Sequence, residues 1–247
     1  MKQSKSLFLM VIIFLTYSSS LTHATENTYD RGSVQNRISP IPEESSDSGT
    51  DKSNQAQLLS NEGRYGEAEE LFKAALAYWD QTPPVEPHSR PSCLTNLGLL
   101  YASERHYDQA IPYYERALSY EEKALSTNDP LIALTVDNLA QAYRLQGKLQ
   151  EAEPLYLKAL AIEEKSMLPD DKDHAITMFN LSLLYLQLKK YDKCEPLMVQ
   201  SLAVLRKNLG EHNPDYLNVY KYYLALLRRT NRSQQANILE QQIRKSP

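Results

Sequence analysis

The chain has 247 residues, of which 42% are hydrophobic and 23% are charged, and these proportions are ordinary for a soluble globular protein. The formal net charge of −4 has the wrong sign for a protein that binds nucleic acid, so the sequence predicts no nucleic-acid partner. Only 7 residues are glycine, and long stretches rich in Ala, Leu, Glu, Lys and Gln favour helices.

The first 24 residues have the pattern of an export signal. Lys2 and Lys5 precede an uninterrupted apolar run over residues 7–15, and small residues at Thr22 and Ala24 stand where signal peptidase recognises the chain. The run is far shorter than the ~20 residues that a membrane-spanning helix needs, although an uncleaved anchor is the alternative. We therefore expect a signal peptide that is cleaved after Ala24, a secreted or periplasmic mature chain, and no membrane span once the signal is removed.

Residues 25–53 are rich in Ser, Asn, Asp, Glu and Pro, with scattered apolar side chains. This composition cannot bury enough apolar surface to offset the entropy of the chain, so we expect a disordered tether. The folded domain is then expected over residues 54–247.

A sequence repeat dominates the rest of the chain. The stretch NLGLLYASERHYDQAIPYYERAL begins at Asn96, and similar stretches begin at Asn138 (NLAQAYRLQGKLQEAEPLYLKAL) and at Asn180 (NLSLLYLQLKKYDKCEPLMVQSL). Each copy starts 42 residues after the previous one. A fixed period of this size is the signature of a stacked-repeat architecture.

Each copy has the periodicity of two helices joined by a tight turn. Leu97, Leu100 and Tyr101 lie at i, i+3 and i+4 on one helical stripe, and a second stripe begins at Tyr107 after the turn SERH. Such a hairpin cannot bury its apolar faces alone, so the sequence predicts an all-α superhelix, or solenoid, of about four to five helical hairpins. The expected repeats are residues 54–91, 92–133, 134–175, 176–217 and 218–247, the last ending in a polar capping helix.

Polar side chains and prolines mark the helix starts. Asp129-Pro130 and Asn213-Pro214 each offer a cap followed by proline at the first helical position, and Asp171 or Asp173 is the candidate in the copy between them. Proline recurs inside the second helices, where we expect it in or just past the first turn, where the lost amide costs little. These prolines are Pro112, Pro154 and Pro196.

No catalytic or metal-binding constellation stands out. Cys93 and Cys194 lie two repeats apart, too far for a disulfide, and are expected to be buried small apolar residues. None of the five histidines pairs with Cys, Asp or Glu at metal-ligand spacing, and His174 and His212 are expected at the solvated surface. The adjacent carboxylates in YEEKAL and IEEKSM are expected to be solvated as well. The sequence thus predicts a protein that is not an enzyme and needs no metal or cofactor.

At this point the repeated residues resemble a known family. A hairpin with Leu-Gly/Ala-x-x-Tyr, then Ala, an aromatic residue and Ala-Leu resembles the tetratricopeptide repeat, and LQGKLQEAEPLYLKALAIEEK at the 42-residue spacing is similar to its kinesin-light-chain subtype. The resemblance covers about residues 54–245. It implies a solenoid whose first helices line a concave groove that binds a peptide or a segment of a partner protein.

The resemblance also implies which residues face that groove. The asparagine just before the Leu of each copy is expected there, and an amide ladder has the donors and acceptors to pair with an extended peptide backbone. The alternative is that each asparagine caps or bridges neighbouring helices. By helical phase five further residues are expected near the same surface, with apolar pockets from Leu99, Phe179 and Leu183. The predicted groove residues are Asn96, Asn138, Asn180, Thr95, Asp137, Gln141, Arg144 and Lys221.

Two functions follow as hypotheses. The first is an exported, non-enzymatic interaction module that binds a partner in the groove. The second is a structural or assembly factor of the cell envelope that acts through the edges of the stack or through oligomerisation. Tyr222 replaces asparagine in the last copy, so the asparagine ladder is expected to stop there. Asp137 and Arg144 have opposite charges, so the sequence predicts no strong preference for acidic or basic peptides.

Overall fold

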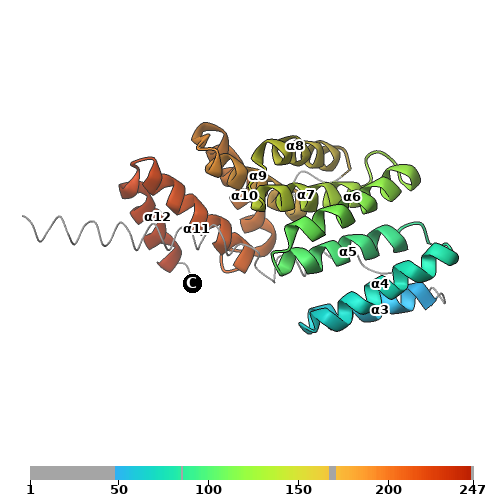
Figure 1. The fold of residues 1–247 in the computed structure, drawn as a ribbon. Coiled ribbons are helices and arrows are strands. Elements are labelled where there is room, and N and C mark those ends of the chain that lie inside the picture. The colour runs from blue at the N-terminus through green and yellow to red at the C-terminus, as the bar shows by residue number, and fades with distance from the viewer. Residues whose placement is uncertain (1–47, 85, 167–170, 246–247) are drawn as a thin grey trace, which may run out of the picture. The chain divides into compact units, whose positions relative to one another are not determined.

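The computed structural model describes residues 48–84, 86–166 and 171–245, all of which belong to one compact unit. In these ranges the chain forms ten α-helices and no β-strand, as the sequence predicts, and consecutive helices pair into hairpins (Figure 1). The pairs are α3 (Ser48–Asn61) with α4 (Tyr65–Gln81), α5 (Ser89–Ser103) with α6 (Tyr107–Ala124), α7 (Pro130–Leu145) with α8 (Leu149–Ser166), α9 (Lys172–Gln187) with α10 (Tyr191–Leu209), and α11 (Pro214–Arg229) with α12 (Ser233–Lys245).

Every hairpin turn contains one residue with a left-handed backbone, and these residues are 42 positions apart. The amide of Gly147 donates to the carbonyl of Arg144 (3.0 Å), and the amide of Lys148 donates to that of Tyr143 (2.9 Å). The two bonds form the Schellman motif, which satisfies carbonyl groups at the end of a helix. The left-handed residues are Gly63 (φ 79°), Arg105 (φ 66°), Gly147 (φ 85°), Lys189 (φ 58°) and Asn231 (φ 61°). The motif therefore imposes this backbone even on side chains that disfavour it.

The starts of the later first helices are capped as expected. The side chains of Asp129, Asp171 and Asn213 accept hydrogen bonds at 2.8–2.9 Å from the amide two residues further on. Each bond satisfies one of the amides that have no partner within the helix. Because the caps share one repeat position, α7, α9 and α11 begin in the same register.

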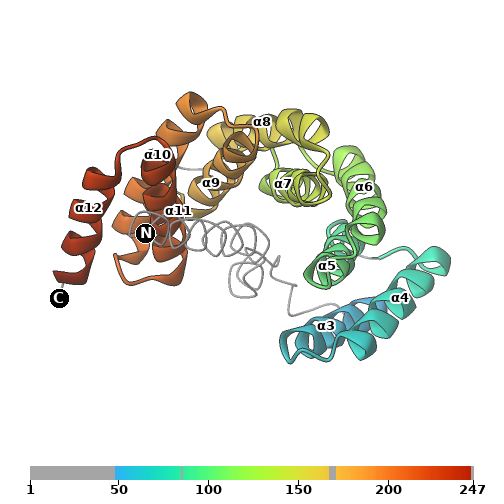
Figure 2. The ribbon, with the colours of Figure 1, turned by 60° about the vertical axis from the view of Figure 1, so that its left-hand side comes forward.

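The hairpins stack through alternating contacts. The second helix of each hairpin packs against the first helix of the next, and we call this contact a junction: α4/α5, α6/α7, α8/α9 and α10/α11. The first helices α3, α5, α7 and α9 also contact one another in sequence. Figure 2 shows α5, α7 and α9 along the inner side of the row and α6, α8 and α10 along its outer side. The predicted superhelical stacking is thereby confirmed.

Tyrosines at one repeat position donate hydrogen bonds across these junctions, although their acceptors stand at different positions of the preceding repeat. The hydroxyl of Tyr101 on α5 donates to Glu69 on α4 (2.5 Å), and that of Tyr143 on α7 donates to Glu115 on α6 (3.0 Å). Burial, followed by the bond to Glu69, raises the pKa of Tyr101 to about 12. The phenol therefore stays a donor at physiological pH.

Small residues let the helices of a hairpin approach closely. A Cβ atom added to Gly98 would lie 2.6 Å from Cε1 of Tyr114, a side chain with no exposed surface. Cys93 and Cys194 are free thiols, fully buried, and burial raises the pKa of each to about 12. Both cysteines thus serve as buried small residues, as the sequence predicts.

The structure moves several boundaries that the sequence predicted. Helix α3 begins at Ser48, where the sequence predicted tether up to residue 53, and Thr50 and Ser53 are buried in it. The other first helices begin three or four residues before the expected starts of their repeats at 92, 134, 176 and 218, because their caps precede the apolar stripe. The signal peptide over residues 1–24, its cleavage after Ala24, and the tether over residues 25–47 lie outside the described residues.

Candidate functional site

The candidate site is the row of first helices α5, α7 and α9, where one asparagine recurs at the same repeat position. Asn96, Asn138 and Asn180 are exposed by only 5%, 3% and 4%. All three lie on the helices that form the inner side of the row in Figure 2. Because the three asparagines share one repeat position, each occupies the same place on its helix.

Two of the three asparagines have an unused donor. The side-chain amide nitrogen Nδ2 of Asn96 and that of Asn138 are buried and have no hydrogen-bond partner among the described residues. A buried amide without a partner costs about 1–3 kcal/mol, so two at equivalent positions represent a sizeable unfavourable free energy in the free protein. A ligand that offered an acceptor to each would recover it.

The third asparagine bridges two hairpins. Nδ2 of Asn180 on α9 donates to both carboxylate oxygens of Asp137 on α7, at 3.1 and 3.3 Å. Asp137 has no exposed surface. Thr95 stands one repeat before Asp137, and its hydroxyl lies 3.2 Å from that of Thr135. At this repeat position the carboxylate of Asp137 therefore accepts from the asparagine amide of the next hairpin, whereas the hydroxyl of Thr95 pairs with Thr135 instead.

The other predicted groove residues divide between the interior and the surface. Arg144 is 3% exposed, and its Nε donates to the hydroxyl of Tyr156 (3.3 Å) within the same hairpin. Gln141 is half-buried and Lys221 is exposed on α11. Of the predicted set, only Gln141 and Lys221 are not buried.

Apolar side chains flank the asparagines. Phe179 on α9 meets Tyr222 on α11 edge to face, with ring centroids 5.5 Å apart. Leu99 and Leu183, also predicted as pocket residues, are 5% and 4% exposed. Sequence reasoning treated Tyr222 only as the end of the asparagine ladder and missed that its ring packs on Phe179.

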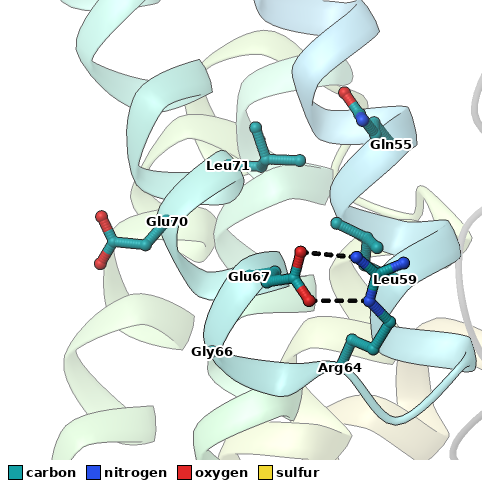
Figure 3. A pocket seen from close by; sticks show the side chains of 7 residues that line it. All are labelled: Gln55, Leu59, Arg64, Gly66, Glu67, Glu70 and Leu71. Carbon is teal, nitrogen blue, oxygen red and sulfur yellow. Dashed lines mark hydrogen bonds and ion pairs between the residues drawn. The ribbon is translucent and has the colours of Figure 1, made fainter.

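A separate open pocket of about 620 Å³ lies between α3 and α4 at the start of the stack. Arg64 reaches over it and donates from Nε and Nη2 to Glu67 at 2.7 and 2.6 Å (Figure 3). Leu59 and Leu71 line it at the positions where Tyr101 and Tyr113 stack one repeat later, with centroids 5.5 Å apart. The pocket is open because two leucines occupy the positions that two stacked tyrosines fill in the next hairpin.

One sequence prediction about acidic residues was wrong. Glu121 and Glu163, the first glutamates of YEEKAL and IEEKSM, are 2% and 3% exposed, although Glu122 and Glu164 are solvated as expected. His174 was also expected at the surface but is mostly buried, with Nδ1 at 3.0 Å from Glu163. The usable signal was the threonine that follows each buried glutamate at a constant spacing of 14 residues.

The described residues offer few other kinds of site. They contain no group of three or more His, Cys, Asp or Glu side chains placed to hold a metal ion. Among the described helices, none combines the length and the apolar character that crossing a membrane requires.

Comparison with known protein families identifies the repeat. The sequence model of the Tetratricopeptide repeat matches over residues 52–123, 89–165, 129–207 and 173–245. No curated protein matched the sequence.

Solved structures share the fold at low sequence identity. Nearly identical TPR-like repeats from Podosopora anserina, assigned to a kinesin light chain, superpose with a TM-score of 0.66 at 23% identity, over 78% of this chain and 92% of that one. BtubC (BKLC) from P. vanneervenii gives 0.70 at 21% identity, over 94% and 88%. The apo form of RapI gives 0.69 at 13% identity, over 79% and 69%.

Proposed function

Because the chain belongs to the tetratricopeptide repeat family, a family of protein-interaction modules, we propose that it is non-enzymatic and binds an extended segment of a partner protein along its row of first helices. The observation that carries this proposal is the pair of buried, unused amide donors of Asn96 and Asn138. In the proposed complex each of these amides would donate to a backbone carbonyl of the bound segment.

The spacing of the hairpins suits such a segment. Packed helices lie about 8–10 Å apart, so equivalent side chains on α5 and α7 are separated by about that distance. A polyproline II segment rises about 3.1 Å per residue with three residues per turn, so carbonyls at i and i+3 point the same way about 9 Å apart. The pair of asparagines would then recognise the backbone of the segment, while Phe179, Leu183 and Tyr222 contact its apolar side chains.

The test is a peptide selection followed by a matched pair of variants. Peptides selected from a random displayed library on the full chain would be measured against Asn96→Ala/Asn138→Ala and against the control Asn237→Ala, which lies exposed on α12. Two lost hydrogen bonds of about 0.5–1.5 kcal/mol each predict a loss of affinity of roughly tenfold in the double variant only. Because the lost amides have no partner in the free protein, the melting temperature of the double variant should not fall. Equal affinity for wild type and double variant would refute this binding mode.

We also propose that the module acts outside the cytoplasm, which is supported by the basic, apolar and small-residue pattern of residues 1–24. Amino-terminal sequencing of the protein recovered from its native cells should give a chain that begins at Thr25. A chain that still begins at Met1 would contradict cleavage.

One observation favours assembly as a second candidate function. Leu58 on α3 is 64% exposed, whereas Leu100, Leu184 and Leu226 at the same repeat position are 2% exposed or less. No hairpin precedes α3 among the described residues to cover it, and the α3/α4 pocket of Figure 3 lies on the same hairpin. Light scattering of wild type and Leu58→Gln over a concentration series tests the idea. A mass that is monomeric throughout and unaffected by the substitution would exclude it.

A further inference from the structure

The two central junctions of the stack contain a buried carboxylate at one repeat position. Glu121 on α6 and Glu163 on α8 each accept a hydrogen bond from a threonine of the following first helix, Thr135 (2.9 Å) and Thr177 (2.8 Å). In the two outer junctions the same two positions hold buried apolar or weakly polar side chains. These are Trp79 and Cys93 at α4/α5, and Leu205 and Val219 at α10/α11.

Glu121 is buried without a countercharge. Its Oε2 atom has no hydrogen-bond partner among the described residues. Ile132 stands where His174 stands one repeat later, so α7 offers no histidine to this carboxyl, and Asp129 and Glu122 add negative charge. On α5, Arg90 donates to Tyr120 (2.9 Å) and lies 3.7 Å from Asp80. Burial, and to a lesser extent the two acidic neighbours, raise the pKa of the Glu121 carboxyl to about 7, against the bond from Thr135.

Either protonation state of Glu121 has a bonding arrangement available. The hydroxyl of Thr135 lies between the carboxyl of Glu121 and the hydroxyl of Thr95, which is 3.2 Å away. When the carboxyl is ionised, Thr135 donates to it. When it is protonated, the carboxyl donates to Thr135, which then donates to Thr95. The neutral state therefore has an acceptor for its proton and carries no charge, whereas the ionised state leaves a desolvated charge.

Glu163 differs because a histidine faces it. Nδ1 of His174 on α9 lies 3.0 Å from Oε2 of Glu163, and both side chains are largely buried. The hydrogen bond to Glu163, with the nearby charges of Glu164 and Asp171, raises the pKa of His174 against the opposing effect of burial. At mildly acidic pH the junction α8/α9 thus holds an ion pair, which is lost when the histidine gives up its proton.

The two junctions respond to pH in the same direction. Glu121 has a folded pKa above its ordinary 4.5, so its contribution to stability is complete below that pH and is lost as the pH rises through about 7. His174 also has a raised pKa, so its contribution is present below 6.5 and is lost as the pH rises through its folded value. We propose that the junctions α6/α7 and α8/α9 act together as a proton-controlled clamp on the hairpin α7/α8. The clamp is closed at mildly acidic pH and loosens above neutrality.

Thermal unfolding of the full chain between pH 5.5 and 8.5 tests the clamp. The melting temperature of wild type should fall across this range, and Glu121→Gln, which keeps the shape of the neutral carboxyl, should melt at least ~4 °C above wild type at pH 8.5. His174→Gln should lower the melting temperature at pH 5.5 and leave it nearly unchanged at pH 8.5. Glu70→Gln removes the same charge from an exposed position on α4 and should follow wild type at every pH.

A second measurement does not depend on the variants. The ¹³C resonance of the Glu121 carboxyl in the folded wild type should titrate near neutral pH, well above the ordinary range of glutamate. A wild-type melting temperature that is flat or rises with pH, or a Glu121→Gln variant with the pH dependence of Glu70→Gln, would overturn the proposal. So would a Glu121 carboxyl that titrates in the range of exposed glutamates.

Discussion

The close approach of α5 and α6 makes Gly98→Ala a sharp test of the packing. In an open helix this substitution is favourable by about 1 kcal/mol, because glycine has the lower helix propensity. At Gly98, however, the new Cβ would lie 2.6, 2.9 and 3.0 Å from Cε1, Cδ1 and Cζ of Tyr114. Ordinary carbon contacts are about 3.5–4.0 Å, so the ring or the helix must move by about 1 Å. Tyr114 has no exposed surface and cannot swing aside.

Overpacking of this kind costs about 1–3 kcal/mol, which outweighs the gain in helix propensity and leaves a net destabilisation of about 1 kcal/mol. The melting temperature should fall by about 2–4 °C, measured by circular dichroism. Gly66→Ala in α4 is the matched control, because a Cβ there meets nothing within 4 Å and the variant should be slightly stabilised. In a double-mutant cycle with Tyr114→Leu, the penalty at Gly98 should largely disappear. Gly98→Ala that stabilises as much as Gly66→Ala would refute the reasoning.

Three further outcomes are expected. Leu184→Ala should cost about 2–5 kcal/mol in urea unfolding, whereas Leu58→Ala at the equivalent but 64% exposed position should change stability by no more than about 0.5 kcal/mol; similar costs would contradict the stacking order. Lys189→Gly should stabilise the α9/α10 turn and Gly147→Lys should destabilise the α7/α8 turn, each by about 1 kcal/mol, since both sites are left-handed; the opposite signs would count against the turn assignment. Cys93 and Cys194 should both resist an aromatic disulfide reagent in the native protein and react in denaturant, because burial raises each thiol pKa to about 12; rapid native labelling would show that the core opens.

Periodicity carried most of the fold prediction. A spacing of 42 residues made Tyr101 and Tyr143 equivalent before their glutamate partners were known, and it placed the caps Asp129 and Asn213. The left-handed turn backbone was visible as glycine only at Gly63 and Gly147. At the equivalent residues the turn geometry overrides the preference of the side chain, so residue type gives no sign of it.

The site was harder to predict because neighbouring residues on a helix point about 100° apart. Glu121 and Glu122 look alike in sequence, but one faces the next hairpin and the other faces solvent. Asn138 and Asn180 are likewise identical by repeat position. They differ because Asp137 stands 43 residues before Asn180 and accepts from its amide, while Thr95 stands 43 residues before Asn138. Comparing the residues of adjacent repeats in register would have revealed both distinctions.

The main contacts of the described helices connect each hairpin only to the hairpin before it and the hairpin after it. A pull applied between α3 and α12 is consequently transmitted in series through the junctions, as through the links of a chain. Under load the molecule should lengthen by opening its least stable junction while the other junctions stay intact, so one interface at a time sets its extension.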